Sequence, residues 1–168
     1  QAARLENMVL NMLDFAKPFS IKRKTCNINH LLANAYETVI EAADKRGIKV
    51  KINRKEMPSC YLDEEKILQV LINLLSNAID ASPDGEVVRV TIQNHESALN
   101  IDVSDKGKGI DENLAEKIFE PFISGKSKGT GLGLSISKKI VEAHLGKLEY
   151  MINSYTGTTF RIIIPQDN

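Results

Sequence analysis

Three features are scarce or missing in this 168-residue chain, and each excludes a class of protein. Its two cysteines, Cys26 and Cys60, lie far apart outside a CxxC frame, which fits a reducing compartment better than a disulfide scaffold, and we expect both to be core or surface thiols. Twenty-two basic residues balance 22 acidic ones, so no net field attracts nucleic acid or an anionic membrane. No apolar run approaches the roughly 18 to 20 residues of a membrane span, and the first residues lack a signal-peptide pattern. We therefore expect a cytoplasmic chain that does not bind nucleic acid and that recognises its partners through local sites.

The length fits one compact domain plus an appendage. In residues 3–16 the apolar positions recur at steps of three and four, the period of an amphipathic helix, and Pro18 ends the pattern. This helix either packs on its own domain or forms an arm that meets another helix or chain. Because the chain opens inside a helical pattern, membrane segments upstream in a parent protein remain open.

The remaining pattern is richer in helix in its first half and richer in strand in its second. After a polar connection at 22–29, we expect helices at 30–46, 63–82 and 134–144, strands at 48–53, 86–94, 99–103, 147–152 and 158–164, and a loop-rich stretch at 105–133. This order predicts an α+β fold, a two-layer α/β sandwich with a mixed sheet of about five strands and three main helices on one face.

The helix at 63–82 carries a polar stripe on an otherwise apolar surface. Its members follow at steps of three and four and are Lys66, Gln69, Asn73, Asn77 and Asp80. Asparagine is a mediocre helix former, and an amide among leucines needs partners. The two asparagines therefore either brace neighbouring loops or offer a carbonyl oxygen to Mg²⁺, which prefers oxygen ligands.

Two glycine-bearing segments suggest a bound nucleotide. Asp105-Lys-Gly-Lys-Gly109 follows a strand, where a carboxylate can accept a hydrogen bond from the amino group of a base, although the same pattern occurs as an ordinary turn. Gly129-Thr-Gly-Leu-Gly-Leu134 leads into a helix, whose first amides attract an anion. A P-loop is excluded because Glu120 stands where its first glycine belongs, and a dinucleotide fingerprint because Leu134 replaces its third glycine.

Taken in order, these segments resemble the sequence boxes of one family. Asn73-Leu-Leu-Ser-Asn77-Ala, Asp105-x-Gly-x-Gly, Phe119-Glu-Pro-Phe122, Gly129-Thr-Gly-Leu-Gly-Leu and Gly157-Thr-Thr-Phe resemble the catalytic ATP-binding domain of sensor histidine kinases, in the gyrase, Hsp90, histidine kinase and MutL superfamily. The resemblance covers roughly residues 25–165 and implies the Bergerat ATP-binding fold. Residues 5–18 resemble the end of the second dimerisation helix, which implies a dimerisation part at 1–18, a linker at 19–24 and a catalytic domain at 25–168.

The resemblance also implies roles for individual residues. Asn77 would coordinate Mg²⁺, Asp105 would hold the adenine amino group, and Asn73 and Lys126 would serve as catalytic residues on the phosphate side. Lys126, alone or with Lys128, would reach the outer phosphates as a flexible point charge. The alternative is that either lysine is a solvated loop charge. The implied ATP-binding set is Asn73, Asn77, Asp105, Gly107, Gly109, Ile110, Lys126, Gly129, Thr130, Gly131, Leu132, Gly133, Leu134 and Thr159.

The implied reaction is transfer of the ATP γ-phosphoryl group to a histidine on a dimerisation helix, then to a response-regulator aspartate, in a protein that acts as a homodimer. None of His30, His95 and His144 has the surroundings of that acceptor. ATPases of the superfamily carry a glutamate base where this chain has Asn73. The chain departs from the family at Asp80, where a basic residue is common, and at His144-Leu-Gly, where His-Gly-Gly is usual.

Two other functions remain open from the sequence. One is a serine protein kinase of the anti-sigma-factor type, and the other is a nucleotide-binding regulatory module without catalysis.

Overall fold

The computed structural model describes residues 20–53, 59–95, 97–125, 129–155 and 157–166. The predicted helix at 3–16, Lys126 and Lys128 lie outside these residues. The elements in chain order are β1 (Lys24–Cys26), α2 (Ile28–Asp44), β2 (Lys49–Asn53), β3 (Cys60–Leu62), α3 (Glu64–Ala81), β4 (Val87–His95), β5 (Ala98–Ser104), α4 (Glu112–Ala115), α5 (Gly133–Ala143), β6 (Lys147–Ile152) and β7 (Thr158–Pro165).

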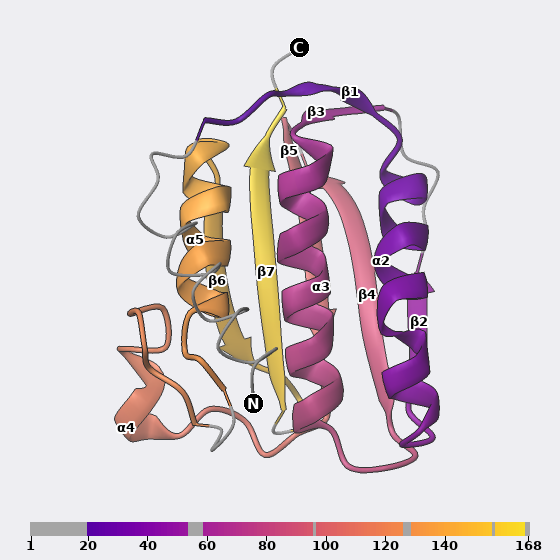
Figure 1. The fold of residues 1–168 in the computed structure, drawn as a ribbon, viewed down its shortest axis with the longest axis vertical. Coiled ribbons are helices and arrows are strands. Elements are labelled where there is room, and N and C mark those ends of the chain that lie inside the picture. Colours follow the sequence, from indigo (N-terminus) through magenta and orange to yellow (C-terminus); the bar gives the residue numbers. More distant parts are fainter. Residues whose placement is uncertain (1–19, 54–58, 96, 126–128, 156, 167–168) are drawn as a thin grey trace, which may run out of the picture.

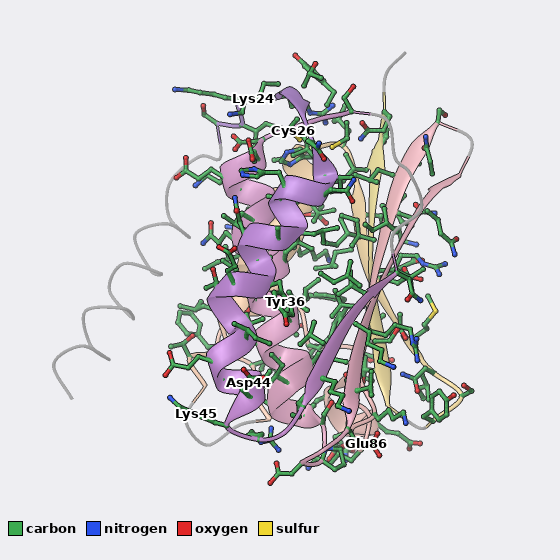
Figure 2. All side chains as sticks on the ribbon, turned by 90° about the vertical axis from the view of Figure 1, so that its right-hand side faces the viewer. Lys24, Cys26, Tyr36, Asp44, Lys45 and Glu86 are labelled. Carbon is green, nitrogen blue, oxygen red and sulfur yellow. The ribbon has the colours of Figure 1, made fainter. Side chains whose placement is uncertain are left out.

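The described residues build a two-layer sandwich. Five strands form one sheet in the order β2-β4-β5-β7-β6, in which β2 runs parallel to β4 and every other neighbouring pair is antiparallel. α2, α3 and α5 lie side by side on one face of this sheet (Figure 1), and the view from the side shows the helices and the sheet as separate layers (Figure 2). The predicted α+β sandwich with a mixed five-stranded sheet is confirmed.

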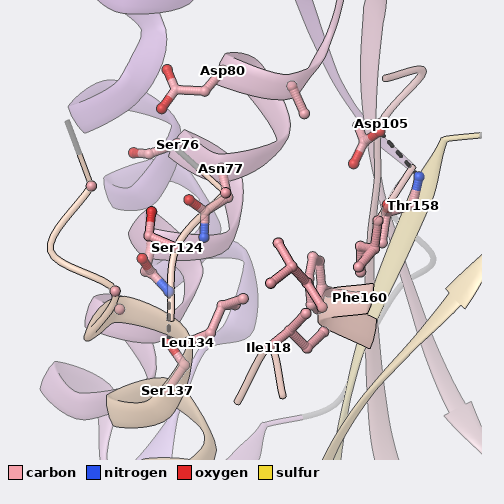
Figure 3. A pocket seen from close by; sticks show the side chains of 18 of the residues that line it. Ser76, Asn77, Asp80, Asp105, Ile118, Ser124, Leu134, Ser137, Thr158 and Phe160 are labelled. Atoms are coloured by element: carbon pink, nitrogen blue, oxygen red, sulfur yellow. Dashed lines mark hydrogen bonds between the residues drawn. The ribbon is translucent and has the colours of Figure 1, made fainter. Parts of the chain in front are cut away.

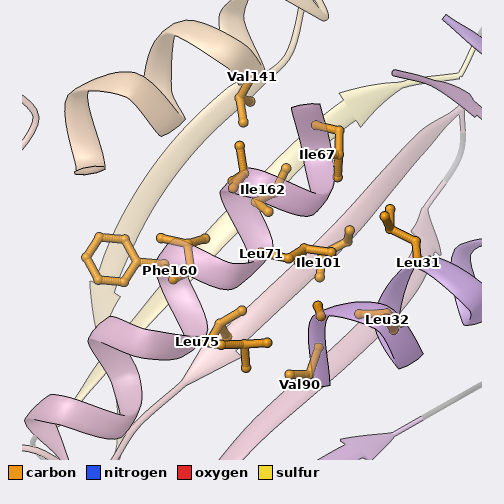
Figure 4. Packing of buried hydrophobic residues seen from close by; sticks show 14 of the residues in the cluster. Leu31, Leu32, Ile67, Leu71, Leu75, Val90, Ile101, Val141, Phe160 and Ile162 are labelled. Carbon is orange, nitrogen blue, oxygen red and sulfur yellow. The ribbon is translucent and has the colours of Figure 1, made fainter. Parts of the chain in front are cut away.

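α3 is the central element of the helical layer, with α2 on one side and α5 on the other. Leu71 and Leu75, two of its buried leucines, belong to the same cluster as Val90 of β4 and Ile101 of β5 (Figure 4). Shortening one such leucine to alanine would cost about 2–5 kcal/mol. The polar stripe of α3 is therefore carried by a helix that the core holds in place.

Three short elements appear where the sequence predicts connections or loops. β1 lies inside the expected polar connection and pairs antiparallel with β3, and α4 is a single turn within the loop-rich stretch. A strand of three residues is too short to show alternation, and β1 exists because its backbone pairs with β3. The pairing also makes the two distant cysteines, Cys26 and Cys60, direct cross-strand partners.

A hydrogen-bonded junction joins the start of α3 to the end of α5. The Asp63 backbone N–H donates to His144 Nε2 at 3.0 Å, and His144 Nδ1 lies 2.7 Å from the Ile140 carbonyl oxygen, so the ring is neutral with its proton on Nδ1. The Lys22 N–H donates to the Asp63 carboxylate at 2.7 Å, and the Arg23 side chain donates to the His144 carbonyl. Burial lowers the pKa of His144, which is fully buried.

Candidate functional site

A pocket of about 1360 Å³ opens on the polar stripe of α3. Its walls come from α3, the segment after β5, the start of β7, and the glycine segment that leads into α5, which are far apart in the sequence but meet in space (Figure 3). The predicted site residues that line it are Asn73, Asn77, Asp105, Gly109, Ile110, Gly129, Thr130, Gly131, Gly133 and Leu134.

Asp105 stands at one end of the pocket, directly after β5, and its side chain is buried. Its Oδ1 accepts hydrogen bonds from the backbone N–H groups of Gly107 at 2.7 Å and Thr158 at 3.1 Å. Burial raises the pKa of Asp105, whereas these two bonds lower it. Both bonds go to Oδ1, so this oxygen fixes the carboxylate, and the group points into the pocket in Figure 3.

Two glycines let the backbone pass close to this end of the pocket. A Cβ on Gly107 would lie 2.7 Å from the Ala81 carbonyl oxygen, and a Cβ on Gly157 would lie 2.3 Å from the Asp105 carbonyl oxygen. Any side chain at either place would displace the segment that orients Asp105. Gly107 of the Asp105 motif thus serves close packing rather than an ordinary solvent-exposed turn.

The polar stripe of α3 forms one wall of the pocket. Of its members, Gln69, Asn73, Asn77 and Asp80 line the pocket and Lys66 does not, whereas Ser76, beside the stripe, also contributes to the wall. In Figure 3, Ser76, Asn77 and Asp80 follow one another along the helix on the side that faces the glycine segment. Asn77 and Asp80 together present an amide oxygen and a carboxylate one helical turn apart, the hard oxygen donors that Mg²⁺ prefers.

Asn73 links α3 to α5. Its Nδ2 donates to Ser137 Oγ at 2.9 Å, and its Oδ1 lies 2.3 Å from the place where a Cβ on Gly133 would sit. Ser137 is buried. This bond braces Asn73 against a neighbouring element, as in the first of the two alternatives for the asparagine pair. As an amide, Asn73 cannot remove a proton from water.

The glycine segment before α5 packs against the segment that contains Phe122. Gly131 has φ of +70°, and a Cβ there would lie 2.4 Å from the Phe122 carbonyl carbon. The Phe122 backbone N–H donates to the Gly131 carbonyl oxygen at 2.9 Å. Phe119 packs instead into a cluster with Tyr150 and Phe160, with ring centroids 6.3 and 6.4 Å away. Phe119 therefore anchors this region to the sheet.

Some predicted residues do not line the pocket. Gly107 touches the end of α3, Leu132 is fully buried, and Thr159 bonds through its hydroxyl to Ser104 Oγ at 2.8 Å, while the neighbouring Thr158 contributes to the wall. Lys126 lies outside the described residues. The lining residues that the sequence analysis missed include Ile72, Ser76, Leu114, Ile118, Ser137, Thr158 and Phe160.

Ser137 is the missed residue that a sequence signal could have revealed. It is a polar residue among Ile136, Ile140 and Val141 on the buried side of its helix, four positions after Gly133. A hydroxyl at such a position needs a partner, and Asn73 supplies it.

Comparison with known proteins decides the family. Residues 62–168 match the family described as histidine kinase-, DNA gyrase B-, and HSP90-like ATPase. The chain belongs to this family. Among solved structures, the catalytic domain of the histidine kinase ThkA is similar, with 34% identity and a TM-score of 0.76, over 88% of this chain and 97% of that one. The prediction from the sequence motifs that the chain belongs to the family of histidine kinase catalytic domains is confirmed.

Longer histidine kinases contain a similar segment. Sensor histidine kinase ZraS of Escherichia coli (strain K12) is 32% identical over 98% of this chain and 36% of its own length. Sporulation kinase C of Bacillus subtilis (strain 168) is 34% identical over 96% of this chain and 38% of its own length. ThkA in complex with the response regulator protein TrrA is 32% identical with a TM-score of 0.84, over 99% of this chain and 48% of that one.

The chain thus spans a little over a third of the length of these two curated relatives. Within the part of the chain that the structure describes, no helix combines the length and the apolar character that a bilayer crossing requires.

Proposed function

We propose that this chain is the Mg²⁺-ATP-binding catalytic part of a two-component sensor histidine kinase. It would transfer the γ-phosphoryl group of ATP to a histidine of a dimerisation helix, for relay to an aspartate of a response regulator. The observation that carries the proposal is the convergence of Asp105, Asn77 and the Gly129–Gly133 segment on one pocket in a member of this family.

The base would bind at the Asp105 end of the pocket. With Oδ1 occupied by two backbone donors, Oδ2 would accept a hydrogen bond from the adenine amino group. Ile110, Ile118 and Phe160 line the same pocket and supply apolar surface for a flat ring. Gly107 and Gly109 would hold the backbone close enough for this contact.

The phosphates would bind between α3 and the glycine segment, with Gly129, Thr130, Gly131 and the first amides of α5 as donors. Among the described residues no group of three acidic, histidine or cysteine side chains could hold a metal. Mg²⁺ takes few protein ligands and otherwise water and phosphate oxygens. Asn77 would hold it, and Mg²⁺ would neutralise charge on the phosphates.

Phosphoryl transfer, rather than hydrolysis, is favoured by the side chains around the phosphate end. Asn73 occupies the place of a general base but is an amide committed to Ser137. Of the carboxylates that line the pocket, Asp105 is assigned to the adenine base, Asp80 lies one turn from Asn77 on the metal side, and Asp111 accepts a hydrogen bond from the Asn113 N–H at the start of α4. Catalysis then rests on positioning and electrostatics, and the acceptor must be brought to the γ-phosphate by a partner.

No described histidine of this chain has the place of an acceptor. His144 is fully buried within the α3 and α5 junction. His30 lies on α2, 3.5 Å from Glu64. On the family resemblance, we assign residues 1–18 to the end of a dimerisation helix, 19–24 to a linker and 25–168 to the catalytic domain of a cytoplasmic part that works as a homodimer. A response-regulator partner is supported by the similar ThkA, whose complex with TrrA has been solved.

Radiolabelled ATP with Mg²⁺ tests the proposal. The chain alone should bind nucleotide yet incorporate almost no phosphate and hydrolyse ATP slowly. Adding the dimerisation helices of the same parent, joined or in trans, should restore acid-labile labelling of those helices, because the remaining barrier is one of proximity. Brisk hydrolysis by the chain alone would contradict the proposal, acid-stable labelling of a partner serine would favour a serine kinase, and binding without any labelling would favour a regulatory module.

A further inference from the structure

A cysteine pair lies outside the nucleotide pocket, in the two-stranded sheet formed by β1 and β3. Cys26 and Cys60 are direct partners in the antiparallel register, and their Sγ atoms are 3.2 Å apart although they are 34 positions apart in the sequence. Both are free thiols. Figure 1 shows β1 and β3 together across one end of the helical layer, and Figure 2 shows Cys26 at that end next to Lys24.

The backbone already holds the two residues at a separation that a disulfide accepts. Directly opposed residues in an antiparallel pair have Cα atoms about 4.5–5.5 Å apart, within the range of about 4.4–6.8 Å found for disulfides. The two sulfurs need to approach by little more than 1 Å to reach a bond of about 2.05 Å. Rotation of the two side chains supplies such a shift without a change of strand register.

We propose that Cys26 and Cys60 are a modification site at which an intramolecular disulfide forms and ties β1 to β3. Cys26 Sγ attacks one sulfur of a small disulfide such as oxidised glutathione, forms a mixed disulfide and releases one reduced thiol. Cys60 Sγ then attacks the sulfur of Cys26, forms the Sγ–Sγ bond and releases the second thiol. The two cysteines lose two electrons, the small disulfide gains them, and the two cysteine protons end on the released thiols.

The two cysteines have different roles in this sequence. Cys26 is 8% exposed and Cys60 4%, so a reagent reaches Cys26 more readily. Burial, together with the hydrogen bond to Cys26, raises the pKa of Cys60 to about 12. Burial also raises the pKa of Cys26, but its bond with Cys60 opposes that effect. Cys26 is therefore the attacking thiol, and Cys60 is the resolving thiol, which needs no contact with the reagent.

The disulfide would affect the segment through which the chain enters the domain. β1 follows Lys22 and Arg23, which bond to Asp63 and His144, and β3 leads directly into Asp63, which caps α3. The bond closes the chain around α2 and β2 and restricts the unfolded state. A reduced pair is expected in a reducing compartment, and the modification would report a change to oxidising conditions.

The test follows the thiol state of the whole 168-residue chain in mixtures of reduced and oxidised glutathione, with acid quenching and intact mass measurement. The folded chain should lose two hydrogen atoms, peptide mapping should join Cys26 to Cys60, and the melting temperature should rise by about 5–10 °C. The same mixtures with the chain unfolded in urea provide the reference. The pair should oxidise at a lower fraction of oxidised glutathione when folded than when unfolded.

Single variants separate the two roles. Cys60→Ser should accumulate one glutathione on Cys26 without a rise in melting temperature, whereas Cys26→Ser should react more slowly. The proposal is overturned if the folded pair needs more oxidised glutathione than the unfolded pair, if disulfides form only between chains, or if Cys26→Ser reacts faster than Cys60→Ser. Nucleotide binding is not part of this readout, so the outcome is independent of the proposed function.

Discussion

Replacing Asp105 by asparagine should reverse the base preference of the pocket while the fold survives. In Asp105→Asn the amide oxygen can take the place of Oδ1 and still accept from Gly107 and Thr158, at 2.7 and 3.1 Å in the parent. The amide nitrogen then replaces Oδ2 in the pocket. A donor would face the adenine amino group, which is also a donor, so the base contact changes from favourable to unfavourable.

The magnitude follows from the bond that is lost. A hydrogen bond to a charged group contributes about 1.5–3 kcal/mol, so ATP affinity should fall by roughly 10- to 150-fold. A 6-oxo purine presents an acceptor at the same place, and the affinity for a GTP analogue should therefore rise. Burial raises the pKa of Asp105, which shows that the ionised carboxylate is penalised there, so the neutral amide should not lower the melting temperature.

Calorimetric titration with non-hydrolysable ATP and GTP analogues, alongside thermal melting, measures both effects. Asp111→Asn is a matched control, because Asp111 also lines the pocket and also accepts a backbone N–H at 2.9 Å, at the start of α4. It should leave the ratio of ATP to GTP affinity unchanged. If Asp105→Asn kept the parent's preference for ATP, Asp105 would not be the residue that reads the base.

Three further perturbations probe other parts of the structure. Asn77→Asp should lower Mg²⁺-ATP affinity by at least about tenfold with an unchanged melting temperature, because a carboxylate would face the phosphates; near-normal calorimetric binding would remove Asn77 from the metal site. Gly133→Ala should lower the free energy of unfolding by about 1–3 kcal/mol in denaturant titrations, because its Cβ would lie 2.3 Å from Asn73 Oδ1. Gly125→Ala, whose Cβ would have its nearest contact at 3.6 Å, should be neutral, and equal effects of the two substitutions would contradict the clash at Gly133. Burial lowers the pKa of His144, so the free energy of unfolding should be level above pH 6.5 and should fall as the pH drops from 6.5 toward the lowered folded value, because the unfolded chain takes up the proton first. Urea titrations at several pH values should show this fall in the free energy of unfolding in the parent and not in His144→Gln. If the curves of parent and variant ran parallel, a group other than His144 would be responsible for the titration.

The sequence predicted the large elements well because their periodicity is long enough to read. α3 was expected at 63–82 and is found at Glu64–Ala81, with Asp63 as its cap. The sheet strands, the mixed topology and the pocket wall on the polar stripe of α3 follow from the same patterns. The glycine segment and the Asp105 segment were expected to share a pocket on the basis of the family resemblance, because their spacing in the sequence does not relate them.

The details that could not be predicted depend on pairing between distant segments. The three residues of β1 carry no alternation of their own and become a strand only against β3. The choice between Thr158 and Thr159 depends on strand parity: in the register, Thr159 lies opposite Ser104 and bonds to it, whereas the Thr158 N–H reaches Asp105. The link between Asn73 and Ser137 required the packing of α3 against α5, which no local pattern reveals.

The two ends of the pocket are held differently, and this has a consequence for ligand design: Asp105 directly follows the sheet strand β5, whereas residues 129–132 of the glycine segment lie outside the helices and strands. Asp105 follows the strand that pairs on both sides, with β4 and with β7, so its carboxylate is positioned before any ligand arrives. A small aromatic fragment with one amino group would find its contact ready-made, and little of its binding free energy would be spent on ordering the protein. Fragments should therefore gain affinity per atom faster when they are built outward from the Asp105 end than when they begin with a phosphate mimic at the glycine segment.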